Sequence, residues 1–123
     1  MHYTKLKISS EATNKLRTLK SRTGLTPNLL CRMALMYSLE EGAIGENTPL
    51  PNEDGSEFNS YTLTGENTDL FLSLISLVEN KSNSTLNNKD IIDMMRTHID
   101  RGISSLFIRV KSSLDLISLL LKT

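Results

Sequence analysis

Three observations in the sequence predict a mainly α-helical fold that opens with one short strand. Residues 4–8 alternate between apolar and cationic side chains, which is the period-two pattern of a half-buried strand. Residues 21–42 then contain signals that end one helix, form a turn and begin another. Beyond them, apolar residues recur at steps of three and four, which predicts about three further helices.

The expected strand has one apolar and one cationic face. Its two lysines, Lys5 and Lys7, are expected on the face opposite the apolar side chains. Ser9 is expected to cap the helix that follows, because its side-chain oxygen can accept a backbone N–H of the first turn. The apolar stripe of that helix comprises Ala12, Leu16 and Leu19.

The next segment predicts two helices joined by a tight turn. Gly24 suits the left-handed conformation that ends a helix. Thr26 is an N-cap residue for the second helix, and Pro27 occupies its first position, where the missing N–H costs nothing. Gly42 is expected to end this second helix, so the pair forms a hairpin with a buried inner face.

Residues 43–60 are predicted to form a long loop, because glycine and proline recur through them. A loop of this length in a compact domain is typical of a functional, mobile or interface segment. Phe58 is expected to anchor the end of the loop, and residues 61–64 are expected to form a short strand.

The last part of the chain predicts three helices. One spans residues 68–79, and a polar connector follows at 80–88. Another is expected to be capped by Asn88 and stopped by Gly102. The apolar stripe of residues 103–121 keeps its phase throughout, which predicts a single helix. Its wide apolar face indicates a subunit interface.

These elements suggest one domain over residues 1–123. It divides into a strand-helix-helix module at 1–42, an acidic loop at 43–65 and a helical part at 66–123. No positively charged leader and no apolar run long enough for a membrane span is visible, so we expect a cytoplasmic protein.

The net charge of zero hides a strong segregation of charge along the chain. Residues 1–38 contain seven basic residues and one acidic residue, whereas residues 39–80 contain nine acidic residues and no Lys or Arg. Residues 81–123 contain seven basic and four acidic residues. A basic end of this density suits a polyanion-binding surface, and the acidic middle suits a basic partner or the protein's own basic surface. The alternative is a solvated helix face of uneven sign.

A cationic strand followed by two helices is the outline of a ribbon-helix-helix module. In such modules two strands pair across a dimer and present side chains to nucleic acid. The alternative for Lys5 and Lys7 is an edge strand that lysine protects from aggregation. The candidate DNA-binding residues are Lys5, Lys7, Lys15, Arg17, Lys20, Arg22 and Arg32.

No active site is evident in the sequence. His2 and His98 have no cysteine or acid at metal-ligand spacing, and both are expected to be solvated or structural. Cys31 is expected to act as a small apolar residue. No phosphate-binding loop or dinucleotide-binding motif is present. We therefore expect no metal, no cofactor and no catalysis by this chain alone.

Four stretches carry a resemblance to a known family: TGLTPNLLCR (residues 23–32), SLEEG (38–42), YTLTGE (61–66) and HIDRGI (98–103). In these the chain resembles the DndE family of the bacterial DNA phosphorothioation system. The resemblance implies a homo-oligomer, a tetramer, with a ribbon-helix-helix-like core. It also implies binding to nicked duplex DNA beside the other Dnd subunits, which exchange a phosphate oxygen of DNA for sulfur.

Two other functions remain open at this stage. A sequence-specific ribbon-helix-helix regulator would read a short palindrome through the strand residues near Lys5 and Lys7. A protein–protein adaptor would use the acidic middle and the last helix without contacting DNA.

Overall fold

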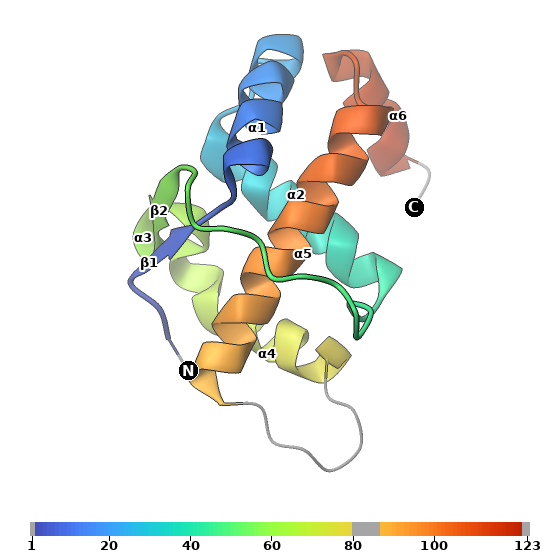
Figure 1. Cartoon of the computed structure of the whole chain (residues 1–123). Helices are drawn as coiled ribbons and strands as arrows, with labels where there is room; N and C mark the ends of the chain where they lie inside the picture. Colours follow the sequence, from blue (N-terminus) through green and yellow to red (C-terminus); the bar gives the residue numbers. More distant parts are fainter. Residues whose placement is uncertain (1, 80–86, 122–123) are drawn as a thin grey trace.

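The computed structural model describes residues 2–79 and 87–121 and is mainly α-helical, as the sequence predicts (Figure 1). Its elements, in order, are β1 (Lys5–Lys7), α1 (Ser10–Thr23), α2 (Pro27–Glu41), β2 (Glu57–Asn59), α3 (Ser60–Leu63), the 3-10 turn η1 (Gly65–Asn67), α4 (Thr68–Glu79), α5 (Asn88–Arg109) and α6 (Ser113–Leu121). None of the helices in this part of the chain has the length and apolar character of a membrane span.

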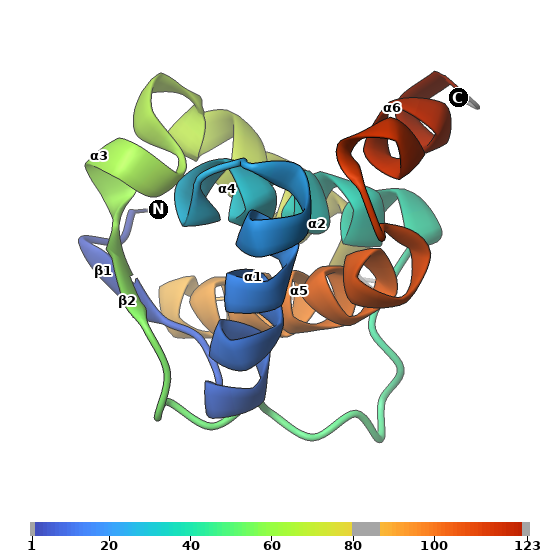
Figure 2. The ribbon, with the colours of Figure 1, turned by 90° about the horizontal axis from the view of Figure 1, so that it is seen from above.

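The long helix α5 runs through the middle of the molecule, with α1, α2 and α4 packed around it (Figures 1 and 2). The core between them is apolar, and Leu19, Leu35, Ile75 and Ile99 have no exposed surface. Each buried side chain of this size contributes about 1.5–3 kcal/mol, so the apolar core between these helices dominates the stability of the fold.

The predicted end of a helix at Gly102 is wrong, because Gly102 lies inside α5. A Cβ atom at this position would collide with the backbone of Ala34 on α2. Glycine therefore serves a close approach of two helix backbones here, and its helix-breaking tendency of about 1 kcal/mol is outweighed by that packing.

The hairpin predicted between the first two helices is confirmed. The Ser9 hydroxyl accepts a hydrogen bond from Ala12 N at 3.0 Å, and Gly24 adopts the left-handed conformation with φ of 78°. Thr26 accepts from Leu29 N at 3.3 Å, and Pro27 is the first residue of α2. Local capping chemistry fixes both ends of this turn.

The continuous last helix predicted for residues 103–121 is wrong. The chain leaves α5 after Arg109 and re-enters a helix at Ser113. Ser112 Oγ accepts from Asp115 N at 3.3 Å, and the Asp115 carboxylate accepts from Lys111 N at 2.9 Å. These bonds cap a new helix start, and periodicity alone does not reveal them because the apolar phase survives the break.

The strand β1 pairs antiparallel with β2 of the same chain, with Leu6 opposite Phe58. This differs from the ribbon-helix-helix pattern, in which the partner strand comes from a second copy. Phe58 is buried, as expected. The strand predicted at 61–64 is wrong: Asn59 Oδ1 accepts from Thr62 N at 3.0 Å and starts the short helix α3 instead.

The loop between α2 and β2 runs across α5 (Figure 1). Two arginines of that helix hold it there. Arg96 donates to the carbonyl oxygens of Lys7, Pro51 and Asn52 at 2.7–2.8 Å. Arg101 donates to the carbonyl oxygens of Ser38 and Gly42 at 2.6 Å. We call Arg96 and Arg101 the loop clamp.

The polar connector predicted at 80–88 lies mostly outside the described residues, which resume at residue 87. The cap of α5 is Asn87 rather than the predicted Asn88, because Asn87 Oδ1 accepts from Asp90 N at 2.9 Å.

Candidate nucleic-acid interface

The two strand lysines lie beside acidic residues of the loop. Lys5 and Lys7 are exposed on β1, where Lys7 is directly opposite Glu57 of β2. Lys5 Nζ lies 3.9 Å from the Glu57 carboxylate. The intramolecular pairing of the strands therefore offsets part of the positive charge that the sequence predicts for this face.

The four predicted cations of α1 lie on two different faces of that helix. Lys15 and Arg22, seven residues apart, share the face toward the end of α5. Arg17 and Lys20, three residues apart, are exposed on another face. Arg17 donates to Asn14 Oδ1 at 3.2 Å.

Three cations converge on the ring of Phe107 near the C-terminal end of α5. Lys15 Nζ lies 5.8 Å from the ring centroid, the Arg22 guanidinium carbon 4.8 Å and Lys111 Nζ 5.5 Å. These distances are within the range of a cation–π interaction. We call Lys15, Arg22, Lys111 and Phe107 the cationic cluster.

Backbone oxygens and a hydroxyl hold the cationic cluster in place. Arg22 donates to the carbonyl oxygens of Phe107 and Val110 at 3.0 and 3.3 Å, which completes the C-terminal end of α5. Lys15 donates to Ser104 Oγ at 3.0 Å. None of the three side chains forms an ion pair within the described part of the chain. Their charge is therefore available to an anion.

The sequence-based candidates leave out Lys111, because they all come from the basic segment 1–38. In the structure Lys111 lies just beyond the end of α5, where its Nζ donates to Phe107 O at 3.3 Å. Arg109 was missed as well; its guanidinium lies 5.9 Å from the Tyr37 ring on α2.

The last predicted cation, Arg32, lies on α2, and its buried Nε has no hydrogen-bond partner among the described residues.

A second polar group lies inside the molecule, between α2, α4 and α5. Ser38 Oγ and the Glu79 carboxylate lie 2.8 Å from the two ring nitrogens of His98. Arg101 Nε donates to Ser38 Oγ, so the serine proton is free to be donated to His98 Nδ1. His98 is then neutral, and its Nε2–H is donated to Glu79.

The order Ser, His and carboxylate also occurs in hydrolase triads. Here Ser38 and His98 have no exposed surface, which makes the group a structural network that ties three helices together. Burial lowers the pKa of His98 below its ordinary value, although the Glu79 carboxylate acts in the opposite direction. His98 is thus the satisfied structural histidine that the sequence predicts.

The remaining reactive side chain is Cys31, which is fully buried in α2. Burial raises the pKa of its thiol to about 12, so the residue acts as an apolar core side chain, as predicted. Among the described residues, no group of three or more His, Cys, Asp or Glu side chains is arranged to hold a metal ion.

Comparison with known proteins points to one family. Residues 5–113 match the family model of DndE, the DNA sulphur modification protein. The fold is similar to that of DndE from Escherichia coli B7A, a protein involved in DNA phosphorothioation modification. That match has a TM-score of 0.72 and 25% identity and covers 86% of this chain and 98% of the other.

A second similar crystal structure is that of a DndE variant with glycine-to-lysine changes. It has a TM-score of 0.70 and 23% identity and covers 86% of this chain and 99% of that one, a likeness that concerns the fold. A search of curated protein sequences found no match.

Proposed function

The chain belongs to the DndE family of DNA sulphur modification proteins, and on that premise we propose that it is the DNA-binding subunit of the system. In this proposal it binds duplex DNA, preferably nicked, and reads little of the sequence. The observation that carries the proposal is the cationic cluster, in which three cations from α1 and the end of α5 converge without an ion pair in the described part of the chain.

The cationic cluster is suited to the phosphate backbone. Each Lys or Arg that neutralises a phosphate releases condensed counterions, and such contacts position a protein without reading bases. Arg17 and Lys20 extend the positive surface along α1. Lys5, Lys7 and Arg32 are included in the proposal as further candidate phosphate contacts. A nick makes the duplex easier to bend, which favours a curved path over several such cations.

The test is a fluorescence-anisotropy titration of labelled nicked and intact duplexes across salt concentrations. The test variant carries both Lys15→Glu and Lys111→Glu. It removes two cations from the cationic cluster and introduces two carboxylates, which repel the DNA phosphates. We expect at least a tenfold loss of affinity and a shallower salt dependence, by about 0.9 in the logarithmic slope for each lost contact. The control is Lys89→Glu at the opposite end of α5, an exposed lysine paired with Asp93, which should change affinity less than about twofold.

Other outcomes would identify the rival functions. Unchanged affinity and slope in the double variant would contradict this interface. Tight binding to one sequence alone, with a specificity ratio of about a thousand or more, would favour the regulator. Retention of no DNA at any salt concentration would favour the adaptor.

The proposal gives this chain no reaction of its own: the other Dnd subunits would carry out the sulfur chemistry. Its support is that the Ser38–His98–Glu79 network is buried and that Cys31 is held as a thiol by its raised pKa.

We also propose a homo-oligomer, a tetramer, in which α6 contributes to the contact between copies. Among the described side chains of α6, Leu116 is buried, whereas Leu114, Ile117 and Leu121 are 51–80% exposed. An apolar helix face of this kind is stabilised when a second copy covers it. Light scattering should give a smaller mass for Leu114→Lys than for the unchanged chain; an equal mass would contradict the assignment.

A further inference from the structure

The outward face of α4 is a second apolar surface, separate from α6. Leu70, Leu74 and Leu77 recur at steps of four and three, so they share one side of the helix. Their exposed fractions are 56%, 37% and 73%, while Phe71 and Ile75 on the other side are buried against the core. Three large apolar side chains in one exposed row indicate a binding surface rather than scattered surface leucines.

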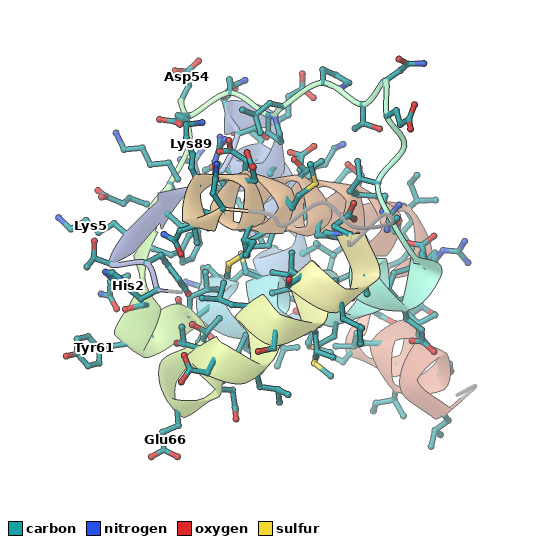
Figure 3. The ribbon with its side chains drawn as sticks, turned by 90° about the horizontal axis from the view of Figure 1, so that it is seen from below. His2, Lys5, Asp54, Tyr61, Glu66 and Lys89 are labelled. Carbon is teal, nitrogen blue, oxygen red and sulfur yellow. The ribbon has the colours of Figure 1, made fainter. Side chains whose placement is uncertain are left out.

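Acidic residues border this row at its N-terminal end. Asp69 in the first turn of α4 and Glu66 just before it are exposed. Tyr61 on α3 is 90% exposed and lies with Glu66 near this end of α4 (Figure 3). We call Tyr61, Glu66, Asp69, Leu70, Leu74 and Leu77 the α4 surface.

The charge of the α4 surface argues against two of its possible occupants. DNA would meet acidic residues here, and like charges repel. Two α4 helices packed antiparallel would bring each acidic N-terminal end to the C-terminal end of the other helix. That end carries partial negative charge and no basic residue in its last turn. Two copies packed through α4 would therefore bring no opposite charges together.

The arrangement of the molecule leaves the α4 surface accessible when the other proposed surfaces are in use. In Figure 1, α4 lies at the bottom of the molecule, whereas α6 and the C-terminal end of α5 lie at the top. DNA on the cationic cluster and a second copy on α6 would both lie at that upper end. The α4 surface is thus available to a different macromolecule.

We infer that the α4 surface binds an amphipathic helix of another subunit of the modification system, with lysine or arginine beside its apolar face. An apolar row with acidic neighbours is complementary to such a helix: the leucines supply the buried contact and the acids fix the orientation. Tyr61 supplies an aromatic side chain of the type that is enriched in interfaces. This inference rests on the proposed function, because it assigns a surface to the partner subunits.

The test compares two matched substitutions, Leu77→Lys on α4 and Leu114→Lys on α6. The two leucines are 73% and 71% exposed, so neither change disturbs the core. Lysine at position 77 also lies in the last turn of its helix, where a cation is favourable. Each variant is produced together with the other Dnd subunits, and co-purification, oligomeric mass and affinity for nicked DNA are measured.

We expect Leu77→Lys to weaken retention of the partner subunits by about tenfold or more and to leave mass and DNA affinity unchanged. Leu114→Lys should lower the oligomeric mass, because it changes the proposed contact between copies. Asp69→Lys should reduce retention of a synthetic lysine/leucine amphipathic helix, while the glutamate/leucine version of that peptide should gain affinity for the same variant.

Four results would overturn the inference. Retention of the partner subunits by Leu77→Lys would show that they bind elsewhere, and a lower mass for this variant would show that a second copy occupies the α4 surface. If the unchanged chain retains no subunit yet binds nicked DNA, the docking surface is wrong while the DNA-binding function stands. If the unchanged chain neither retains a subunit nor binds nicked DNA, the docking surface and the DNA-binding function are both contradicted.

Discussion

Arg101 and Arg109 lie on the same helix, eight residues apart, and are used in opposite ways. Arg101 belongs to the loop clamp and donates to the carbonyl oxygens of Ser38 and Gly42. Arg109 is exposed at the end of α5, with its guanidinium over the Tyr37 ring. The middle of α5 thus uses its cations to fix the chain, and the end of α5 leaves its cations available to a partner.

This difference shows why the number of basic residues in a segment does not by itself measure a binding surface. A cation contributes to recognition to the extent that it keeps donors and charge free of acidic partners. Arg101 uses Nε and both terminal nitrogens on the chain, whereas Arg22 donates through Nη1 alone among the described residues. Changes in the middle of α5 should therefore alter stability, and changes at its end should alter binding.

The largest effect is expected at the close contact between α5 and α2. Gly102→Ala adds a Cβ that collides with the backbone of Ala34, so the free energy of unfolding should fall by about 2–3 kcal/mol. The matched control is Gly45→Ala in the loop, whose Cβ would lie 3.5 Å from Thr48 Oγ1, an ordinary contact. Chemical denaturation measures both. A Gly102→Ala protein as stable as the control would contradict the close packing.

The two arginines provide the most direct test of the comparison. Arg101→Met leaves three carbonyl oxygens and Ser38 Oγ without this donor, and we expect a loss of about 2 kcal/mol. Arg109→Met should change stability by less than about 0.5 kcal/mol, because its side chain is exposed. Equal effects on stability would remove the distinction between the two regions.

A pH dependence of stability is expected from the middle of α5. Burial lowers the pKa of His98 in the folded protein, whereas in the unfolded chain the pKa is near 6.5. The unfolded state then binds more protons, so the free energy of unfolding should fall as the pH drops below about 6.5, by at most about 1.4 kcal/mol per pH unit. His98→Gln should flatten this slope in denaturation curves between pH 7 and 5. A slope unchanged by the substitution would assign the proton uptake to another group.

The smallest effect is expected at the strand. Lys5 lies 3.9 Å from the Glu57 carboxylate in an exposed pair, and such pairs contribute about 0.2–1 kcal/mol. Lys5→Gln should therefore lower DNA affinity less than Lys111→Gln, which removes an unpaired cation of the cationic cluster. A larger effect for Lys5 would move the centre of the DNA interface to the strand.

The hairpin of α1 and α2 could be predicted from the sequence because its signals are local. Ser9, Gly24, Thr26 and Pro27 each act within a few residues, and each has its expected role in the structure. The helix α4 could also be predicted, because its bounds at residues 68 and 79 match those that the apolar periodicity indicates.

The failures of prediction share a different cause, since they depend on contacts between distant residues or on competing caps. Gly102 breaks no helix because Ala34 passes against it, and the apolar phase of residues 103–121 continues through a break that Ser112 and Asp115 create. Periodicity records only which side chains face the core, so it does not detect either event.

Charge segregation predicts a basic end of the chain, and the DNA-binding role of its residues stays a prediction. The convergence of Lys15, Arg22 and Lys111 on Phe107 was not predicted, because it requires the packing of α1 against α5. The roles of Arg96 and Arg101 as a loop clamp were also invisible, because carbonyl acceptors leave no trace in a sequence.

The pairing of β1 with β2 within one chain has a consequence for how the protein folds. When a sheet is built from two molecules, its formation is a second-order event that slows on dilution. Here residues 5–7 and 57–59 belong to one chain, so this ribbon should form in a first-order step whose rate does not depend on protein concentration. The cost is the closure of a long loop, which the α1–α2 hairpin shortens once it has formed, and we therefore expect the hairpin to precede the ribbon during folding.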